Sequence, residues 1–216
     1  MSFFRVISRG RARSAAIADG HDRPAFLGRR TAASLVGRAR VERDDLVFEI
    51  GAGTGVLTRE LAAIARRVVA VELDPTLASR LRRRFSSSAN VEVVQGDALT
   101  VPLPGAPFRA FGNIPFAITT RLLHRLLEEP ASALERADHV VQEQVARKRA
   151  ASPPRNLVTL SWAPWWRFER GPRLPAYVFH PRPGTDAAVL TVIRREPPLI
   201  DPSSRPSYRR LLERAF

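Results

Sequence analysis

The segment EIGAGTG, residues 49–55, places three glycines at alternate positions between an apolar run and an amphipathic run. The apolar run, residues 46–50, predicts a short buried strand, and residues 56–64 have the periodicity of a helix. Glycines at such a turn let a ligand lie against the backbone, and the start of the helix offers unpaired N–H groups. The spacing GxGxG is one residue shorter than GxGxxG, which weakens the case for a pyrophosphate ligand. The loop therefore predicts a ligand site at the end of a strand.

Strand-like and helix-like runs alternate along most of the chain. Further strands are predicted at residues 67–73, 91–94, 108–113 and 138–142. Further helices are predicted at residues 26–39, 76–85, 119–127 and 144–151, the last ended by Pro153 and Pro154. This alternation indicates βαβ units, and hence an α/β fold with a mostly parallel sheet covered by helices on both faces. Residues 189–194 alternate as an edge strand would.

The length of 216 residues predicts one main domain with short appendages. Residues 1–24 are basic and lack apolar periodicity, so we expect an arm. Residues 25–195 hold the α/β pattern. Residues 196–216 are proline-rich and then briefly helical, which is too short for a second core. We expect a short C-terminal tail.

The charge balance indicates a polyanionic partner. Lys and Arg total 35 against 21 Asp and Glu, a net charge of +14, and Lys148 is the single lysine. A coding bias towards arginine explains the choice of Arg over Lys but not the excess over the acids, so nucleic acid is the favoured partner. The four histidines lack ligand spacing and the chain has no cysteine, so no metal site is expected. No apolar run approaches the roughly 18 residues of a membrane span, and we expect a cytoplasmic protein.

Two acidic residues close the next two predicted strands. Glu72 ends the second strand, at about the distance where an acid meets a ribose diol in doubly wound folds, and Asp97 ends the third strand. A glycine loop followed by two acids suits a neutral or cationic nucleoside better than a phosphorylated one. The alternative is that both acids cap helices, but Asp74, beside Pro75, is the better cap.

The segment FGNIPF, residues 111–116, closes the fourth strand. The side-chain oxygen of Asn113 and the carbonyl of Ile114 supply two neighbouring hydrogen-bond acceptors, and Pro115 fixes the backbone without adding an N–H. Phe116 adds an aromatic ring directly after them. Taken alone, the segment is better explained as an ordinary turn, because Asn and Pro are common turn residues.

The motifs EIGAGTG, AVELDP, QGDAL and FGNIPF, in this order and at these intervals, resemble those of the rRNA adenine N6-methyltransferases. That family includes the Erm resistance methylases and the small-subunit rRNA dimethyladenosine transferases, and the similarity covers roughly residues 20–195. The resemblance implies a Rossmann-like class I methyltransferase domain at residues 25–195, with S-adenosylmethionine as cofactor. It implies cofactor contacts from Glu49, Gly51, Ala52, Gly53, Glu72, Leu73, Asp97, Ala98 and Asn113. It makes Asn113, Ile114, Pro115 and Phe116 the catalytic residues. An exocyclic adenine amine is a poor nucleophile, so the resemblance implies that the Asn113 side-chain oxygen and the Ile114 carbonyl accept its two hydrogens and turn its lone pair towards the methyl donor. It also implies that a flipped-out base stacks on Phe116.

Details of the fourth motif favour one branch of the family. Asn113 stands where related DNA adenine methylases carry aspartate, which favours RNA, and NIPF differs from the NLPY usual in small-subunit enzymes. The resemblance therefore implies methylation of N6 of an adenine in 23S rRNA, naked or in a precursor particle, by a monomer. Resistance to macrolides, lincosamides and streptogramin B would follow. The alternatives are 16S rRNA dimethylation and a noncatalytic nucleic-acid-binding protein on the same fold.

Two regions are candidates for holding RNA. The segment FHPRPGTD, residues 179–186, resembles a late family loop beside the active site, so Phe179 is either a second wall for the target base or a core residue. The family usually has a substantial helical C-terminal domain, which is reduced or missing here, so the helix with Arg147, Lys148 and Arg149 is expected to hold RNA. The segment HDRPAFLGRR replaces the family's usual Gln-Asn-Phe. Trp162, Trp165 and Trp166 are expected to pack in the core.

Overall fold

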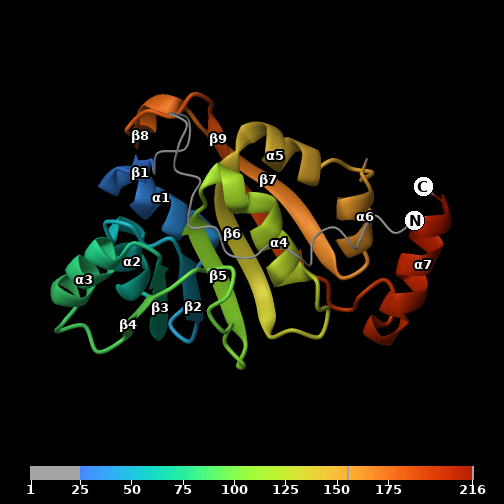
Figure 1. The fold of residues 1–216 in the computed structure, drawn as a ribbon, viewed down its shortest axis with the longest axis horizontal. Helices are drawn as coiled ribbons and strands as arrows, with labels where there is room; N and C mark the ends of the chain where they lie inside the picture. The colour runs from blue at the N-terminus through green and yellow to red at the C-terminus, as the bar shows by residue number, and fades with distance from the viewer. Residues whose placement is uncertain (1–24, 155, 216) are drawn as a thin grey trace.

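A seven-stranded sheet forms the centre of the fold in a computed structural model, which describes residues 25–154 and 156–215 (Figure 1). The predicted basic arm, residues 1–24, lies outside the described residues. The strands are β1 (Phe26–Leu27), β2 (Leu46–Ile50), β3 (Arg67–Glu72), β4 (Val91–Gln95), β5 (Phe108–Asn113), β6 (Leu134–Gln142), β7 (Trp166–Leu174), β8 (Phe179–His180) and β9 (Ala187–Arg194). The helices are α1 (Arg29–Ala39), α2 (Val56–Ala62), α3 (Pro75–Arg84), α4 (Thr119–Leu127), α5 (Glu143–Arg149), α6 (Leu157–Trp162) and α7 (Arg205–Ala215), with short 3-10 turns at Phe116–Ile118, Ala176–Val178 and Pro202–Ser204.

The order of strands in the sheet is β4-β3-β2-β5-β6-β9-β7. The first five strands in this order run parallel, and β9 is antiparallel to both of its neighbours, β6 and β7. The chain moves outward from β2 to β3 and β4, then returns to β5 on the other side of β2. Ligands of open α/β sheets bind at the carboxyl ends of the strands where this reversal occurs. The fold therefore places a site at the ends of β2 and β5.

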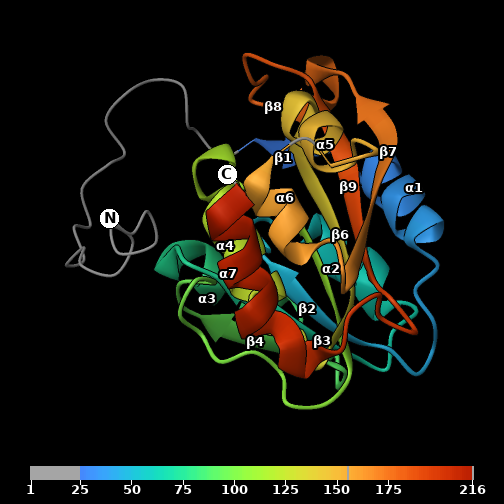
Figure 2. The ribbon, with the colours of Figure 1, turned by 90° about the vertical axis from the view of Figure 1, so that its right-hand side faces the viewer.

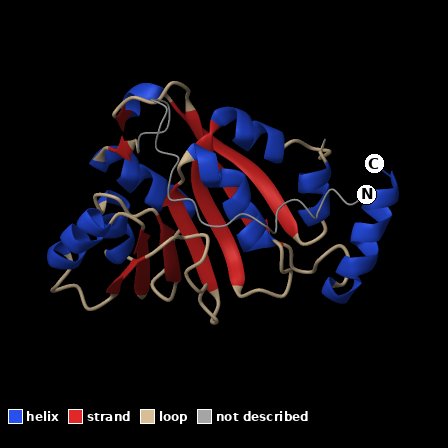
Figure 3. Ribbon diagram, viewed as in Figure 1, coloured by secondary structure: helices blue, strands red, loops and turns tan. Residues whose placement is uncertain are grey.

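Helices cover both faces of the sheet, as the alternation of strands and helices predicts (Figure 3). Apolar side chains pack between these helices and the strands. Residues of α1, α2 and α3 cover one face. Residues of α4 and α6 cover the other, where Trp162, Trp165 and Trp166 are each at most 2% exposed. Figure 2 shows α4, α6 and α7 together on one side of the sheet. The prediction that the three tryptophans belong to the core is confirmed.

The strands expected at residues 46–50 and 108–113 are confirmed, and those at 67–73, 91–94 and 138–142 differ only at their ends. The helix expected at 26–39 begins at Arg29 instead. Phe26 and Leu27 pair antiparallel with β8, and Gly28 is extended at φ −74° and ψ 156°, so the chain turns into the helix only after them. Tertiary pairing outweighs local pattern at these two residues.

The prediction that residues 189–194 form an edge strand is wrong. β9 lies between β6 and β7, and five of its eight residues are buried. The edge strand is β7, whose sequence WRFERGPRL carries three arginines and a glutamate among its nine residues. These polar side chains suit an edge, but with a glycine and a proline they hide the strand from a search for apolar alternation.

The predicted tail contains α7, which packs beside α6. Tyr208 donates a hydrogen bond to the Leu160 carbonyl, and its ring meets Trp165 edge-on with centroids 5.8 Å apart. Arg205 forms an ion pair with Glu128 of α4. Across residues 25–154 and 156–215, no helix has the length and apolar character needed to cross a membrane.

Candidate functional site

The glycine loop leaves the end of β2 in a conformation that L side chains rarely adopt. Gly51, Gly53 and Gly55 have φ of 69°, 57° and 76°. A Cβ at Gly55 would lie 2.6 Å from a methyl carbon of Leu81, and one at Gly53 would lie 3.0 Å from the Phe26 ring. The Ala52 N–H donates to the Val71 carbonyl, and the Ala52 carbonyl accepts from the Gly55 N–H, so backbone hydrogen bonds hold the turn. The three glycines are therefore required by the path of the chain and by close neighbours.

Glu72, at the end of β3, braces the glycine loop. Its carboxylate accepts hydrogen bonds from the Gly53 N–H at 2.7 Å and the Asp74 N–H at 2.9 Å. A carboxylate offers about four lone-pair positions, so two backbone bonds leave acceptor capacity for a ligand. Asp74 caps α3 through the N–H groups of Thr76 and Leu77, as the sequence predicts.

An apolar residue follows Glu72 at the end of β3, and a second acid follows β4. Leu73 follows Glu72 and is 67% exposed, which is unusual for a large apolar side chain. Asp97 follows β4 and accepts a hydrogen bond from the Leu99 N–H at 2.8 Å, and the neighbouring Ala98 is buried. The Asp97 side chain therefore closes a turn between β4 and β5, and no helix begins there that it could cap, which was the alternative to a ligand role for this residue.

Glu49 lies within β2 and is 0% exposed. Burial raises its pKa to about 8, although Thr58 faces the carboxyl group and opposes the shift, and nearby Glu72 adds to it. Neither carboxyl oxygen has a hydrogen-bond partner of normal geometry among the described residues. An unpartnered buried carboxyl group is costly, so a group that completes its contacts would be bound strongly.

Asn113 ends β5 beside the glycine loop. A Cβ at Gly51 would lie 3.8 Å from the Asn113 carbonyl oxygen, so the ends of β2 and β5 are adjacent. The Asn113 side-chain nitrogen donates a hydrogen bond of 2.6 Å to the backbone carbonyl of Ala25. No described residue donates to the Asn113 side-chain oxygen, so within the described part of the chain this oxygen is available to accept a hydrogen bond from another group.

Ala25 belongs to a segment that crosses the site, which we call the strap (residues 25–27). Its Phe26 and Leu27 pair with β8, and the Phe26 ring contacts Gly53. The strap therefore touches the glycine loop and the end of β5 at once. Sequence reasoning missed Ala25 and Phe26 as site residues, because a backbone acceptor leaves no trace in the sequence.

The residues after Asn113 present a second acceptor. Ile114 is 2% exposed and its N–H donates to the Val140 carbonyl. The Pro115 carbonyl accepts from Ile118 and Thr119, whereas no described residue donates to the Ile114 carbonyl. Pro115 is exposed, and Phe116 is half-buried against the residues of the α1–α3 face. An acceptor pair thus lies beside an aromatic ring.

The residues expected to hold RNA fall into two groups. Arg147 and Lys148 are exposed. Arg149 is 6% exposed, donates to Asn156 and Thr159, and lies over the Trp162 ring at 5.6 Å. Arg149 therefore packs within the protein, which contradicts a direct role in RNA binding. Burial of its charge also lowers its pKa.

Phe179 is 5% exposed and pairs with Leu27 in the strap. Of the two roles expected from sequence, the burial favours the core residue over the wall for a base. Nearby Tyr177 is 73% exposed. The aromatic ring that this loop presents to the outside is therefore the tyrosine, which sequence reasoning did not single out.

The sheet order, the glycine loop after β2 and the acid after β3 define a class I methyltransferase fold of the Rossmann-like type. The solved 23S rRNA methyltransferase ErmE superposes with a TM-score of 0.80 at 37% identity, covering 87% of this chain and 77% of that one. The chain belongs to the ribosomal RNA adenine dimethylase family, whose model matches residues 27–216.

Curated relatives agree with this family. An rRNA adenine N-6-methyltransferase of Corynebacterium diphtheriae is 38% identical over 170 residues, which are 79% of this chain and 66% of the relative. The mycinamicin-resistance protein MyrB of Micromonospora griseorubida is 37% identical over 170 residues, covering 79% of this chain and 53% of that protein. The chain spans about half to two thirds of the length of the curated relatives it matches.

Proposed function

We propose that this chain is a cytoplasmic, monomeric enzyme that methylates N6 of a specific adenine in 23S rRNA, with S-adenosylmethionine as the methyl donor. Resistance to macrolide, lincosamide and streptogramin B antibiotics would follow. The observation that carries the proposal is the acceptor pair of Asn113 and Ile114 at the end of β5, beside the glycine loop. Support for 23S rRNA comes from ErmE, and support for resistance from the name of MyrB.

The residues at the strand ends fit a cationic nucleoside. The acids Glu49, Glu72 and Asp97 and the exposed Leu73 gather at the ends of β2, β3 and β4. Glu72 would accept hydrogen bonds from ribose hydroxyls while bracing Gly53. Asp97 and the neighbouring Ala98 would contact the adenine, with the exposed Leu73 close by, and Gly51 and Gly53 would lie near the methionine part. S-adenosylmethionine supplies an electrophilic methyl group on a sulfonium.

Asn113 would act through its side-chain oxygen. Its nitrogen is held by the Ala25 carbonyl, so the oxygen is directed away from the strap. That oxygen and the Ile114 carbonyl would accept the two hydrogens of the adenine amine and direct its lone pair towards the methyl group. This is catalysis by positioning and preorganised dipoles, with Phe116 as the stacking surface for the base.

The proposal explains why an asparagine suits this position. An aspartate could accept from the adenine amine, but it could not donate to the Ala25 carbonyl. The strap therefore gives a local reason for the amide, in addition to the preference for RNA expected from the family. Arg147 and Lys148 are proposed to contact the RNA on the adjacent surface.

The test is incubation with radiolabelled S-adenosylmethionine and separated 16S and 23S rRNA. We expect label in 23S rRNA alone, and digestion of the product should yield N6-methylated adenosine. Label in 16S rRNA would contradict the proposed substrate. Binding of rRNA with no label in either RNA would contradict catalysis.

A further inference from the structure

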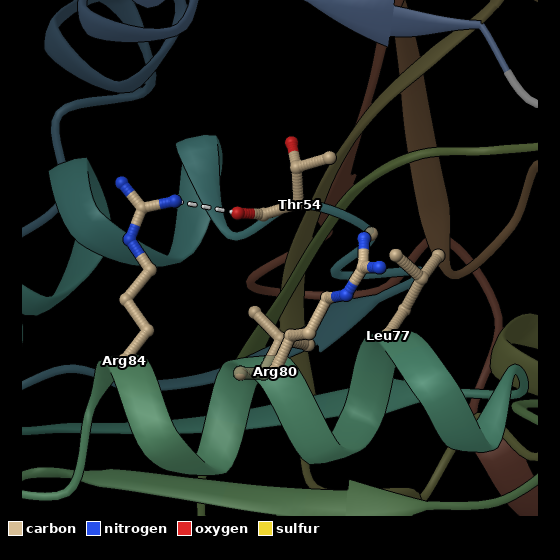
Figure 4. Close-up of a pocket in the computed structure, with 6 residues that line it drawn as sticks. Thr54, Leu77, Arg80 and Arg84 are labelled. Atoms are coloured by element: carbon tan, nitrogen blue, oxygen red, sulfur yellow. Dashed lines mark hydrogen bonds between the residues drawn. The ribbon is translucent and has the colours of Figure 1, made fainter.

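A pocket with a volume of about 240 Å³ lies between the glycine loop and α3. Its lining residues are Gly53, Thr54, Leu77, Arg80, Leu81 and Arg84. Arg80 and Arg84 extend from α3 towards the loop that carries Thr54 (Figure 4). The pocket thus joins the cationic surface of α3 to the loop at the catalytic site.

The Arg84 side chain is held in place. One of its nitrogens donates to the Thr54 carbonyl at 2.7 Å, and its guanidinium carbon lies 5.7 Å from the centre of the Phe85 ring. A guanidinium has five N–H donors, and this backbone contact uses one of them. Arg84 therefore presents a fixed charge with unused donors at a pocket that Arg80 also lines.

The rest of α3 is also cationic. The helix carries Arg80, Arg82, Arg83 and Arg84, and it has no acid after its cap Asp74. None of these four arginines takes part in the ion pairs formed by the described residues. By contrast, three arginines of β7 are each paired with a carboxylate, Arg167 with Glu169, Arg170 with Glu143 and Arg173 with Asp186. The positive charge of α3 is therefore available to a partner.

We propose that this pocket and the α3 arginines bind phosphates of the substrate RNA at a point away from the target adenine. The identity of the RNA rests on the proposed function. A helix of ten residues spans about 15 Å, so arginines on its successive turns would meet a polymer better than a single small anion. Arginine is well suited to phosphate because its planar donors match the oxygens. The acids that suit the cofactor lie at the strand ends instead.

The test compares the double variant Arg80→Gln/Arg84→Gln with the unchanged chain, using a 23S rRNA transcript at several salt concentrations. Each lost phosphate contact lowers the slope of log K against log salt by about 1, so the slope should fall by about 2. The KM for RNA should rise about tenfold, with kcat at saturating RNA and the Kd for S-adenosylmethionine unchanged. The variant Arg80→Lys/Arg84→Lys keeps both charges and should recover most of the slope.

The control is Arg43→Gln/Arg66→Gln. These exposed arginines precede β2 and β3, so they lie at the amino ends of the strands, whereas the glycine loop lies at the carboxyl ends. Their replacement should leave the slope unchanged. An unchanged slope in Arg80→Gln/Arg84→Gln would overturn the inference, and so would weaker S-adenosylmethionine binding, because the pocket would then belong to the cofactor. Failure of the unchanged chain to methylate 23S rRNA would instead refute the proposed function, since binding is measured without turnover.

Discussion

Two buried carboxyl groups occupy one row of the sheet and differ in what surrounds them. Glu49 of β2 and Asp138 of β6 both lie in register with Phe111 of β5, one on each side. Asp138 accepts hydrogen bonds from Arg136 and Thr191 and lies 3.9 Å from Arg109. Glu49 has no such partner among the described residues.

The difference follows from the neighbours. Arg109 also pairs with Asp45 and donates to the Arg40 carbonyl, so a network of charges links α1, β5 and β6. Hydrogen bonding to Asp138 raises the pKa of Arg136. Among the described residues no arginine pairs with Glu49, and burial raises its pKa to about 8 instead. The protein thus supplies the hydrogen bonds of Asp138 itself. The carboxyl group of Glu49, beside the glycine loop, is left to hydrogen-bond with a ligand.

The largest effect on turnover is expected when a carboxylate replaces the Asn113 amide in the candidate site. Asn113→Asp removes the donor to Ala25 and places a charge beside the carbonyl, so turnover should fall about a thousandfold, with cofactor binding nearly intact. Protonation would restore a donor, so residual activity should increase as the pH is lowered. Single-turnover assays over a pH series test this, with Asn113→Ala as the variant that cannot regain activity. A loss of cofactor binding in Asn113→Ala would contradict the assigned role.

The next largest effect is expected on the free energy of unfolding, when the hydrogen-bonded carboxyl group of Asp138 is replaced. Asp138→Asn leaves Arg109 and Arg136 without full compensation, and breaking such buried pairs costs about 3 to 5 kcal/mol. Chemical denaturation should show this loss in the free energy of unfolding. Methyl transfer well below the melting temperature should remain close to that of the unchanged chain. The exposed Asp201→Asn serves as the control, and equal stability of the two variants would refute the network's role.

Glu49→Gln should have opposite effects on stability and binding. The unfolded chain ionises Glu49 near pH 4.5 while the folded chain keeps its proton up to about pH 8, so folding stability is lost as the pH rises between these values. The glutamine variant should therefore gain roughly 2 to 3 kcal/mol at pH 7 and nothing at pH 4. Its affinity for S-adenosylmethionine should fall about tenfold. Melting curves and calorimetric titrations measure both, and unaltered affinity would remove Glu49 from the cofactor site.

The smallest effect is expected at the rim of the site. Phe116 is half-buried against the residues of the α1–α3 face, so Phe116→Tyr keeps the ring and adds a hydroxyl at the periphery. Activity should stay within about twofold, whereas Phe116→Ala should lose most of it because base stacking is worth about 1 to 3 kcal/mol. Steady-state rates with 23S rRNA distinguish the two variants. Similar rates in both would argue against stacking.

The strands and helices that build the site could be predicted because their local signals agree with the fold. The strand from Leu46 to Ile50, the glycines after it and the cap at Asp74 each have a physical reason within a few residues. The family motifs added the order of these parts. The fold class and the positions of the strand ends therefore followed from sequence.

The remaining features depend on residues that are distant in the chain. The contact from Asn113 to Ala25 spans 88 positions and uses a backbone carbonyl, and Phe26 becomes a strand residue only through β8. Arg149 and Arg147 lie two positions apart in one basic run, yet packing against Trp162 buries the first. Composition alone gives both the same expected role. Such outcomes are fixed by packing and cannot be found from local pattern.

The strap has a consequence for how freely this region can change over evolution. Its contact with Asn113 is made by a main-chain oxygen, which every amino acid carries. Replacement of the side chain at position 25 therefore leaves the acceptor in place, provided that Phe26 and β8 keep the path of the chain. Substitutions in this segment can therefore accumulate while the contact to Asn113 is retained. This is consistent with RPAF standing where the family usually has Gln-Asn-Phe.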